Sequence, residues 1–246
     1  MQVLFFPYLN TSFFDGFLFY IANIKRVWYN IPKGGDGMKF EICHVFAAGD
    51  FNGRVNVNKG DLVICADAGY RHAEKLGIHP DILLGDFDSI GELPHVADTI
   101  RHPVEKDSTD SHLAVVEGVK RGYDRFIVYG AIGGTRLEHT LANIQMIAGF
   151  AQNGIDVTLT DGTTECTAIH NSKICFDKTF KGYISVFCMS GHAEGVTIKG
   201  LKYSISDSTL SDSFPLGVSN EFIGTDSEIS VKEGTLIIIY HTKDGK

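Results

Sequence analysis

Three aspartate-bearing loops, each following a predicted strand, constrain the fold of this chain more than any other feature. The first loop contains Asp67, the second Asp86 and Asp88, and the third Asp107 and Asp110. In an open parallel sheet the carboxyl ends of the strands share one edge, and ligands bind in the crevice there. Several carboxylates at one edge suit a hard cation, usually Mg²⁺ carrying substrate phosphates. The pattern predicts a site for a magnesium-bound nucleotide.

The first half of the chain alternates short apolar runs with helical patterns, which favours a parallel sheet covered on both faces. Apolar residues that recur at helical spacing predict the inward faces of two helices, with Leu113, Val116 and Val119 on one. Leu141, Ile144, Ile147 and Ala148 are expected to point inward on the other. Strands are predicted over 40–48, 62–66, 82–84, 99–104 and 126–129, and helices over 70–76, 110–121 and 138–150.

The pattern changes after about residue 156, where short β-like runs are separated by Gly, Asn, Asp and Ser turns. No long helical pattern follows, so a smaller antiparallel β-sandwich is expected as a second domain. The fold class is therefore α/β, with a Rossmann-like parallel sheet followed by an antiparallel β-sandwich. The domain prediction is a leader over 1–37, an α/β domain over 38–155 and a β domain over 156–246.

Residues 1–37 differ in composition from the rest, with the only Trp and a dense run of Phe and Tyr. Their apolar stretch is too short and interrupted for a membrane span, and it lacks the features of a signal peptide. Lys33-Gly34-Gly35, when back-translated, can spell a ribosome-binding site before Met38. One hypothesis is that the native protein starts at Met38. The alternative is an aromatic arm that packs on the body.

The charge and cysteine content narrow the classes of partner and the compartment. A net charge of −8 disfavours a nucleic-acid or anionic-membrane surface, because both require clustered Lys and Arg. A metal ion would reconcile this acidity with phosphate binding, because it reverses the local sign of the field. Five cysteines without a CxxC pair predict buried, reduced thiols in a cytoplasmic protein.

Each loop also has a purely structural interpretation. Asp86 and Asp88 could cap a turn, since Asp favours loops. The segment from Lys106 to Asp110 could cap the following helix, although a helix N-terminus also binds phosphate. Gly133 and Gly134 could admit a phosphate. No GxxxxGK[ST] loop occurs, so ATP would be bound by a motif of another kind.

Taken together, the motifs resemble the thiamine pyrophosphokinase family. Those that carry the resemblance, over roughly residues 40–240, are Cys65-Ala66-Asp67-Ala68-Gly69, Gly85-Asp86-Phe87-Asp88-Ser89, Lys106-Asp107-Ser108-Thr109-Asp110, the segment from Gly133 to Asn143, Gly200-Leu201-Lys202-Tyr203 and Gly217-Val218-Ser219-Asn220-Glu221. Two positions depart from the family's commoner GGRxDH form. Thr135 stands between the glycines and Arg136, and Glu138 replaces the usual Asp.

The resemblance implies transfer of a pyrophosphoryl group from ATP to the hydroxyethyl oxygen of thiamine, giving thiamine diphosphate and AMP. It implies Mg²⁺ on Asp86, Asp88 and Asp110, with Asp67 as a fourth catalytic carboxylate that assists the metal or orients thiamine. It also implies a homodimer whose sites lie between subunits. The implied ATP-binding residues are Gly49, Asp50, Lys106, Asp107, Ser108, Thr109, Gly133, Gly134, Arg136, Glu138, His139 and Asn143, and the implied thiamine-binding residues are Leu216, Gly217, Ser219 and Asn220.

The sequence also allows two other functions. Asp86-Phe87-Asp88-Ser89 matches the nucleophile loop of haloacid-dehalogenase phosphatases, in which Asp86 would attack phosphate. That interpretation leaves the other loops and the β domain unexplained. A non-catalytic thiamine-binding module is the other alternative, but it would not require the full set of acidic residues that this chain carries.

Overall fold

The structure is a computed structural model that describes residues 41–85, 98–101 and 108–241. The predictions for residues 1–37 and for Asp86, Asp88, Lys106 and Asp107 lie outside the described residues. The chain divides into two units, Met1–Phe40 and Glu41–Lys246, and the second contains every element described below. No helix in the described ranges is both long and apolar enough to cross a membrane.

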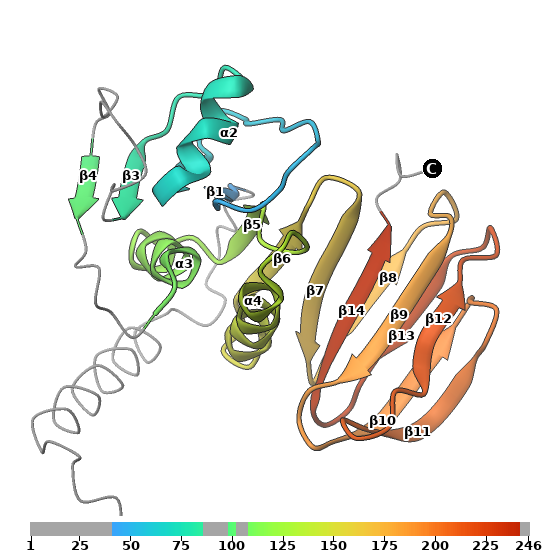
Figure 1. The fold of residues 1–246 in the computed structure, drawn as a ribbon. Coiled ribbons are helices and arrows are strands. Elements are labelled where there is room, and N and C mark those ends of the chain that lie inside the picture. The colour runs from blue at the N-terminus through green and yellow to red at the C-terminus, as the bar shows by residue number, and fades with distance from the viewer. Residues whose placement is uncertain (1–40, 86–97, 102–107, 242–246) are drawn as a thin grey trace, which may run out of the picture. The chain divides into compact units, whose positions relative to one another are not determined.

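Six parallel strands form one part of a ten-stranded sheet in the order β6-β5-β1-β2-β3-β4 (Figure 1). The order reverses at β1, so the carboxyl ends of β1 and β5 flank the topological switch point where ligands bind in such sheets. The strands are β1 (Cys43–Phe46), β2 (Leu62–Ala66), β3 (Ile82–Gly85), β4 (Asp98–Arg101), β5 (Arg125–Tyr129) and β6 (Asp156–Thr160).

Helices cover both faces of this parallel part, as the alternating pattern predicts. On one face Ala73 of α2 packs with Phe46 and Tyr129, while on the other Gly118 of α3 lies against Cys43. The helical elements are η1 (Asp67–Gly69), α2 (Tyr70–Lys75), α3 (Asp110–Lys120) and α4 (Leu137–Ala151).

Helix α3 packs through smaller residues than the apolar stripe predicts. Leu113 and Val116 are half-buried, whereas the fully buried positions are Ser111, Ala114, Val115, Gly118 and Val119. A Cβ at Gly118 would lie 2.4 Å from Phe126 and 2.9 Å from Cys43 Sγ. The glycine therefore lets the helix backbone approach the sheet closely, which turns the larger residues toward the edges of the contact.

The prediction that Leu141 points inward on α4 is wrong, because this side chain is 53% exposed. Ile147 and Ala148 are buried as predicted, and Ile144 is half-buried. The first turns of α4 border the pocket described below rather than the sheet core, so apolar spacing alone did not identify the buried side there.

The sheet continues past β6 as antiparallel strands in the order β7-β14-β9-β12, and a second sheet, β11-β10-β13-β8, packs on them around a shared apolar core. These two layers confirm the predicted α/β fold class with a β-sandwich, although one layer of the sandwich is continuous with the parallel sheet. Strand β6, which begins the predicted β domain, pairs parallel with β5, and the boundary at 155/156 stays a prediction. The strands are β7 (Thr164–His170), β8 (Lys173–Phe176), β9 (Tyr183–Cys188), β10 (His192–Lys199), β11 (Ile205–Ser211), β12 (Gly217–Glu221), β13 (Ser227–Ser230) and β14 (Thr235–His241).

All five cysteines are unpaired, as the spacing predicts. Four are buried, but Cys175 on the edge strand β8 is exposed, which corrects the expectation for this residue. Burial raises the pKa of the Cys65 and Cys166 thiols to about 12. These two thiols therefore stay protonated and act as small apolar core residues.

Candidate functional site

A pocket of about 410 Å³ opens at the carboxyl ends of β1, β2 and β5, at the switch point of the sheet. Four chain segments meet there although they are far apart in sequence. They are the loops that follow β1, β2 and β5, and the first turn of α3, with the start of α4 as a further wall. The predicted residues that line it are Gly49, Asp50, Asp67, Thr109, Asp110, Gly133, Gly134, Arg136, His139 and Asn143.

The loops after β1 and β5 approach each other through two glycines. Gly49 N–H donates to the Gly130 carbonyl at 3.0 Å. A Cβ at Gly49 would lie 2.5 Å from Gly130 O, and one at Gly130 would lie 2.6 Å from Gly49 O. Gly130 also has a φ of +68°. Side chains are therefore excluded at both positions, and bare backbone forms this wall of the pocket.

Asp67 follows β2 with a φ of +48°, a left-handed conformation that non-glycine residues rarely adopt. The turn is close-packed, because a Cβ at Gly69 would lie 2.0 Å from the Phe46 carbonyl oxygen. Residues held in such conformations cluster at functional sites and persist only where the surroundings impose them. Asp67 is thus held at the pocket wall by backbone packing.

The N-terminus of α3 supplies the next wall. Thr109 is the N-cap, and its Oγ1 accepts a hydrogen bond from His112 N–H at 3.2 Å. Asp110 and Ser111 begin the helix and line the pocket. The positive end of a helix dipole and its free N–H groups favour a phosphate at this place. Ser108 is half-buried and is not part of the pocket wall.

His112, near the start of α3, has a structural role. Its half-buried ring lies edge-on to Phe150 at 5.5 Å, and burial lowers its pKa. The side chain therefore tends to remain neutral and packs between α3 and α4.

The glycine-rich loop after β5 provides the wall opposite Asp50. Gly133 and Gly134 have φ values of +76° and +72°, and a Cβ at Gly134 would lie 3.5 Å from Asp50 Oδ2. Thr140 Oγ1 donates to the Gly133 carbonyl at 3.1 Å, which fixes the loop to α4. The loop thus leaves its backbone open to a ligand.

Arg136 and Glu138 form an exposed ion pair at the rim, with Nε 2.8 Å from Oε1 and both side chains 67% exposed. The hydrogen bond from Arg136 lowers the pKa of Glu138. Glu138 does not line the pocket itself. The structure therefore shows Glu138 as a partner of Arg136 at the position where the motif departs from the family pattern.

Asn143 presents an unpaired acceptor at the base of the pocket. Its side chain is buried and donates through Nδ2 to the Ala131 carbonyl at 2.7 Å. Among the described residues, its Oδ1 has no hydrogen-bond partner. Because a buried polar atom without a partner is costly, this oxygen is a candidate acceptor for a ligand N–H or O–H group.

The residues expected to bind thiamine lie on or just before β12, the edge strand of the large sheet. Ser219 is exposed with a φ of +58°, and its N–H donates to Ser185 Oγ at 3.1 Å. Asn220 is buried, and its amide group bonds to the backbone of Tyr203 and Glu221 at 2.7–2.9 Å. Leu216 and Gly217 border a cavity of only about 20 Å³.

The pocket wall contains residues that were not predicted as site residues from the sequence, and some predicted site residues do not line it. The described residues include no group of three His, Cys, Asp or Glu side chains placed to hold a metal, while Asp86 and Asp88 lie outside them. Small residues within or next to the predicted motifs were not assigned to the site, although their position at strand ends was the available signal. They are Ala47, Ala48, Ala66, Ser111, Gly130, Ala131, Thr135 and Thr140.

Comparisons with known proteins agree on one family. Residues 54–159 match the model described as thiamin pyrophosphokinase, catalytic domain, and residues 171–236 match the thiamin pyrophosphokinase vitamin B1 binding domain. The curated thiamine pyrophosphokinase of Bacillus subtilis is 30% identical over 173 residues, which cover 68% of this chain and 80% of that protein.

Solved structures show the same similarity. The crystal structure of Bacillus subtilis thiamine pyrophosphokinase is 27% identical, covering 82% of this chain and 99% of that chain with a TM-score of 0.74. A Geobacillus thermodenitrificans structure, at 23% identity, covers 82% and 97% with a TM-score of 0.69 and shares the fold. The two family models together span more than half of the sequence, and the chain belongs to the thiamine pyrophosphokinase family.

Proposed function

We propose that the protein transfers a pyrophosphoryl group from ATP to the hydroxyethyl oxygen of thiamine, giving thiamine diphosphate and AMP. The observation that carries this proposal is the pocket at the switch point, where glycine backbone, a helix N-terminus and carboxylates meet in a chain of this family. Both matched models are thiamine pyrophosphokinase models, which favours this activity over the haloacid-dehalogenase phosphatase.

The described pocket residues are suited to hold the nucleotide. The bare backbone at Gly49, Gly130 and Gly133 allows phosphate oxygens to approach closely. The N-terminus of α3 and the Arg136 guanidinium supply positive potential for them. Asn143 Oδ1 provides an acceptor for a hydroxyl or amino group of the nucleotide. Each of these groups positions or neutralises the substrate, which is the main requirement of phosphoryl-type transfer.

The bond changes define what must be positioned. The thiamine oxygen forms a bond to the β-phosphorus of ATP as the bond from that phosphorus to the α,β-bridging oxygen breaks. AMP leaves with the bridging oxygen, and the hydroxyl proton of thiamine is released. The protein must therefore hold the hydroxyethyl group in line with the β-phosphorus and its leaving oxygen.

We propose that the reaction is magnesium-dependent. Asp67 and Asp110 line the pocket, and their oxygen donors fit a hard cation. Asp110 with Asp86 and Asp88 would hold Mg²⁺, while Asp67 would assist the metal or orient the hydroxyl group of thiamine. When bound, the ion neutralises charge on the polyphosphate. Lys106, Asp107, Ser108 and Thr109 complete the proposed nucleotide contacts around the start of α3.

We further propose that thiamine is bound by the β12 region of a second copy of the chain in a homodimer. Described residues that line the nucleotide pocket come from positions 47–143, so the β12 region does not reach it within one chain. The 20 Å³ cavity beside Leu216 is also too small for thiamine. Exposed apolar side chains gather in this region, where they suit contact with a ring or a partner, namely Tyr203, Phe214, Leu216 and Val218.

The predicted cellular setting is part of the same proposal. Unpaired cysteines support a cytoplasmic protein. The net charge of −8 supports a small-molecule enzyme without a nucleic-acid or membrane partner, and it also suits the cationic thiazolium ring of thiamine.

Product analysis tests the function directly. The full chain is incubated with ATP and Mg²⁺, with and without thiamine, and the products are separated by anion-exchange chromatography. AMP and thiamine diphosphate formed only when thiamine is present support the proposal. Free phosphate formed without thiamine would support the phosphatase, and thiamine binding without any product would support the non-catalytic module.

A further inference from the structure

His72 of α2 contacts the backbone of the nucleotide pocket from outside its wall. Its Nε2 lies 2.7 Å from the carbonyl oxygen of Gly49. A carbonyl oxygen only accepts hydrogen bonds, so the proton of this contact is on Nε2 of the imidazole. The N–H of the same Gly49 donates to the Gly130 carbonyl at 3.0 Å. Both polar groups of Gly49 are therefore engaged, one by the neighbouring loop and the other by His72.

The imidazole of His72 has an aromatic neighbour from the same loop. Phe51 lies edge-on to His72, with ring centroids 6.0 Å apart, and edge-on to Tyr129 at 5.1 Å. Tyr129 is buried at the end of β5, next to Gly130. Phe51 thus connects the His72 ring to the sheet, which limits the positions that the imidazole can adopt.

The rest of the loop is attached on both sides of Gly49. Ala47 N–H donates to the Tyr129 carbonyl at 2.8 Å, and Asn52 N–H donates to the Asp161 carbonyl at 2.9 Å. The peptide that joins Gly49 to Asp50 lies between these two attachments. The hydrogen bond from His72 acts on the carbonyl of that peptide.

We infer that His72 is a positioning residue for the nucleotide: it orients the Gly49–Asp50 peptide so that the Asp50 N–H faces the pocket and binds an oxygen of the ATP polyphosphate. The described peptide bonds contain no cis isomer, and in a trans peptide the C=O and the following N–H point in opposite directions. Because the Gly49 carbonyl points to His72, the Asp50 N–H points away from His72. Gly49 and Asp50 line the pocket, whereas His72 lies outside its wall.

The inference rests on the proposed nucleotide site. Direct measurement of ATP binding tests the role of His72 separately from the proposed reaction. ATP binding with Mg²⁺ is measured by titration calorimetry, together with the Michaelis constants for ATP and thiamine and the melting temperature. The variants are His72→Ala, His72→Gln, which keeps a side-chain N–H donor, and the control His79→Ala. His79 is an exposed histidine just beyond α2 and outside the pocket wall.

His72→Ala is expected to raise the dissociation constant and the Michaelis constant for ATP by about two- to tenfold, which corresponds to one lost hydrogen bond. The Michaelis constant for thiamine should change by less than about twofold, since thiamine does not contact this peptide. His72→Gln should recover most of the ATP affinity, and His79→Ala should match the wild type.

Three results would overturn the inference. One is a lower melting temperature for His72→Ala with unchanged ATP affinity, which would make the contact merely structural. Another is an equal rise in both Michaelis constants. The third is a wild-type protein that does not bind ATP, which would remove the nucleotide site as well. A wild type that binds ATP but forms no thiamine diphosphate would refute only the proposed reaction, and the binding comparison between the variants would still decide the role of His72.

Discussion

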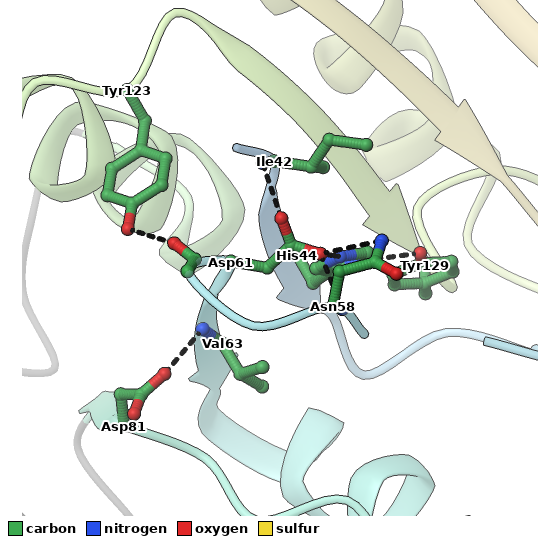
Figure 2. A network of polar contacts seen from close by, with 9 residues as sticks. Ile42, His44, Asn58, Asp61, Val63, Asp81, Tyr123 and Tyr129 are labelled. Carbon is green, nitrogen blue, oxygen red and sulfur yellow. Dashed lines mark hydrogen bonds and ion pairs between the residues drawn. The ribbon is translucent and has the colours of Figure 1, made fainter. Parts of the chain in front are cut away.

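The imidazole Nε2 of His44 lies 3.1 Å from the Asp61 carboxylate, and only 2–3% of either side chain is exposed. On its other side, His44 Nδ1 lies 2.8 Å from the Tyr129 hydroxyl (Figure 2). Asp61 also accepts backbone N–H groups from Ile42 and Asn58. A carboxylate has no proton to donate, so Nε2 carries a proton, and in the neutral imidazole the Tyr129 hydroxyl then donates to Nδ1. This network joins the starts of β1 and β2 to the end of β5, whose last residue, Tyr129, precedes Gly130 of the pocket wall.

Removing the imidazole should destabilise the fold. His44→Phe leaves the buried hydroxyl of Tyr129 without its acceptor and Asp61 without one of its donors, which is expected to cost about 1–3 kcal/mol in the free energy of unfolding. Urea unfolding measures this cost. The double variant His44→Phe with Tyr129→Phe removes both ends of one hydrogen bond, and it should lose less than the two single variants predict by addition. Strict additivity would contradict the network.

The pH dependence of stability should report on Asp61. Burial alone would raise its pKa, but hydrogen bonds from the N–H groups of Ile42 and Asn58, together with His44, outweigh burial and lower the pKa below the usual 3.8. A lowered folded-state pKa adds stability that is present above the unfolded value and is lost as the pH falls through the folded one. Asp61→Asn should remove this component.

Unfolding free energies measured from about pH 6 to about pH 3 test the Asp61 prediction. The wild type should lose more stability than Asp61→Asn as the pH falls below about 4. Above that pH the unfolding free energies of the two proteins should change equally with pH, and that of the variant should be the lower. Equal acid sensitivity in both proteins would show that other carboxylates dominate.

Ser219 should affect thiamine binding without affecting the fold. Ser219→Ala removes one hydroxyl, so the Michaelis constant for thiamine should rise by a few-fold to about tenfold while that for ATP changes little. Ser219→Gly is the matched variant, because it also lacks the hydroxyl but relaxes the φ of +58°. The two variants should share the same kinetic effect, with the glycine variant the more stable. A change in the ATP constant alone would place thiamine elsewhere.

Asn220 is expected to behave differently from its neighbour. Its buried amide holds Tyr203 N–H, Tyr203 C=O and Glu221 N–H, so Asn220→Ala should reduce the free energy of unfolding by about 1–3 kcal/mol. Thermal unfolding checks this loss. An unchanged melting temperature with a large rise in the thiamine constant would instead indicate direct contact with thiamine.

The position of the pocket could be predicted from the sequence because its lining residues follow the ends of strands, whereas its role in nucleotide binding stays a prediction. Asp67 and Gly133 occupy the carboxyl edge of the sheet because their strands, β2 and β5, both run parallel to β1, which lies between them. His72 could not be identified in this way. It lies within a short helix, and its hydrogen bond to Gly49 depends on how that helix packs, which apolar spacing does not specify.

The packing details were the least predictable part. Leu141 has the spacing of a core residue, but its turn of α4 extends to the pocket rim. Strand β11 is rich in Ser, and Val218 is the one apolar side chain of β12, so these strands carried little apolar alternation to reveal them. The unpaired Asn143 Oδ1 is likewise visible only in the folded structure.

The central claim is the transfer of an intact pyrophosphoryl group, and ATP labelled at the β-phosphorus tests it most directly. With wild-type protein, Mg²⁺ and thiamine, the label should appear in thiamine diphosphate in a one-to-one ratio with AMP, and Asp110→Asn should reduce the rate by orders of magnitude. Label retained in ADP, with thiamine monophosphate as the product, would show transfer of a single phosphoryl group and contradict the account.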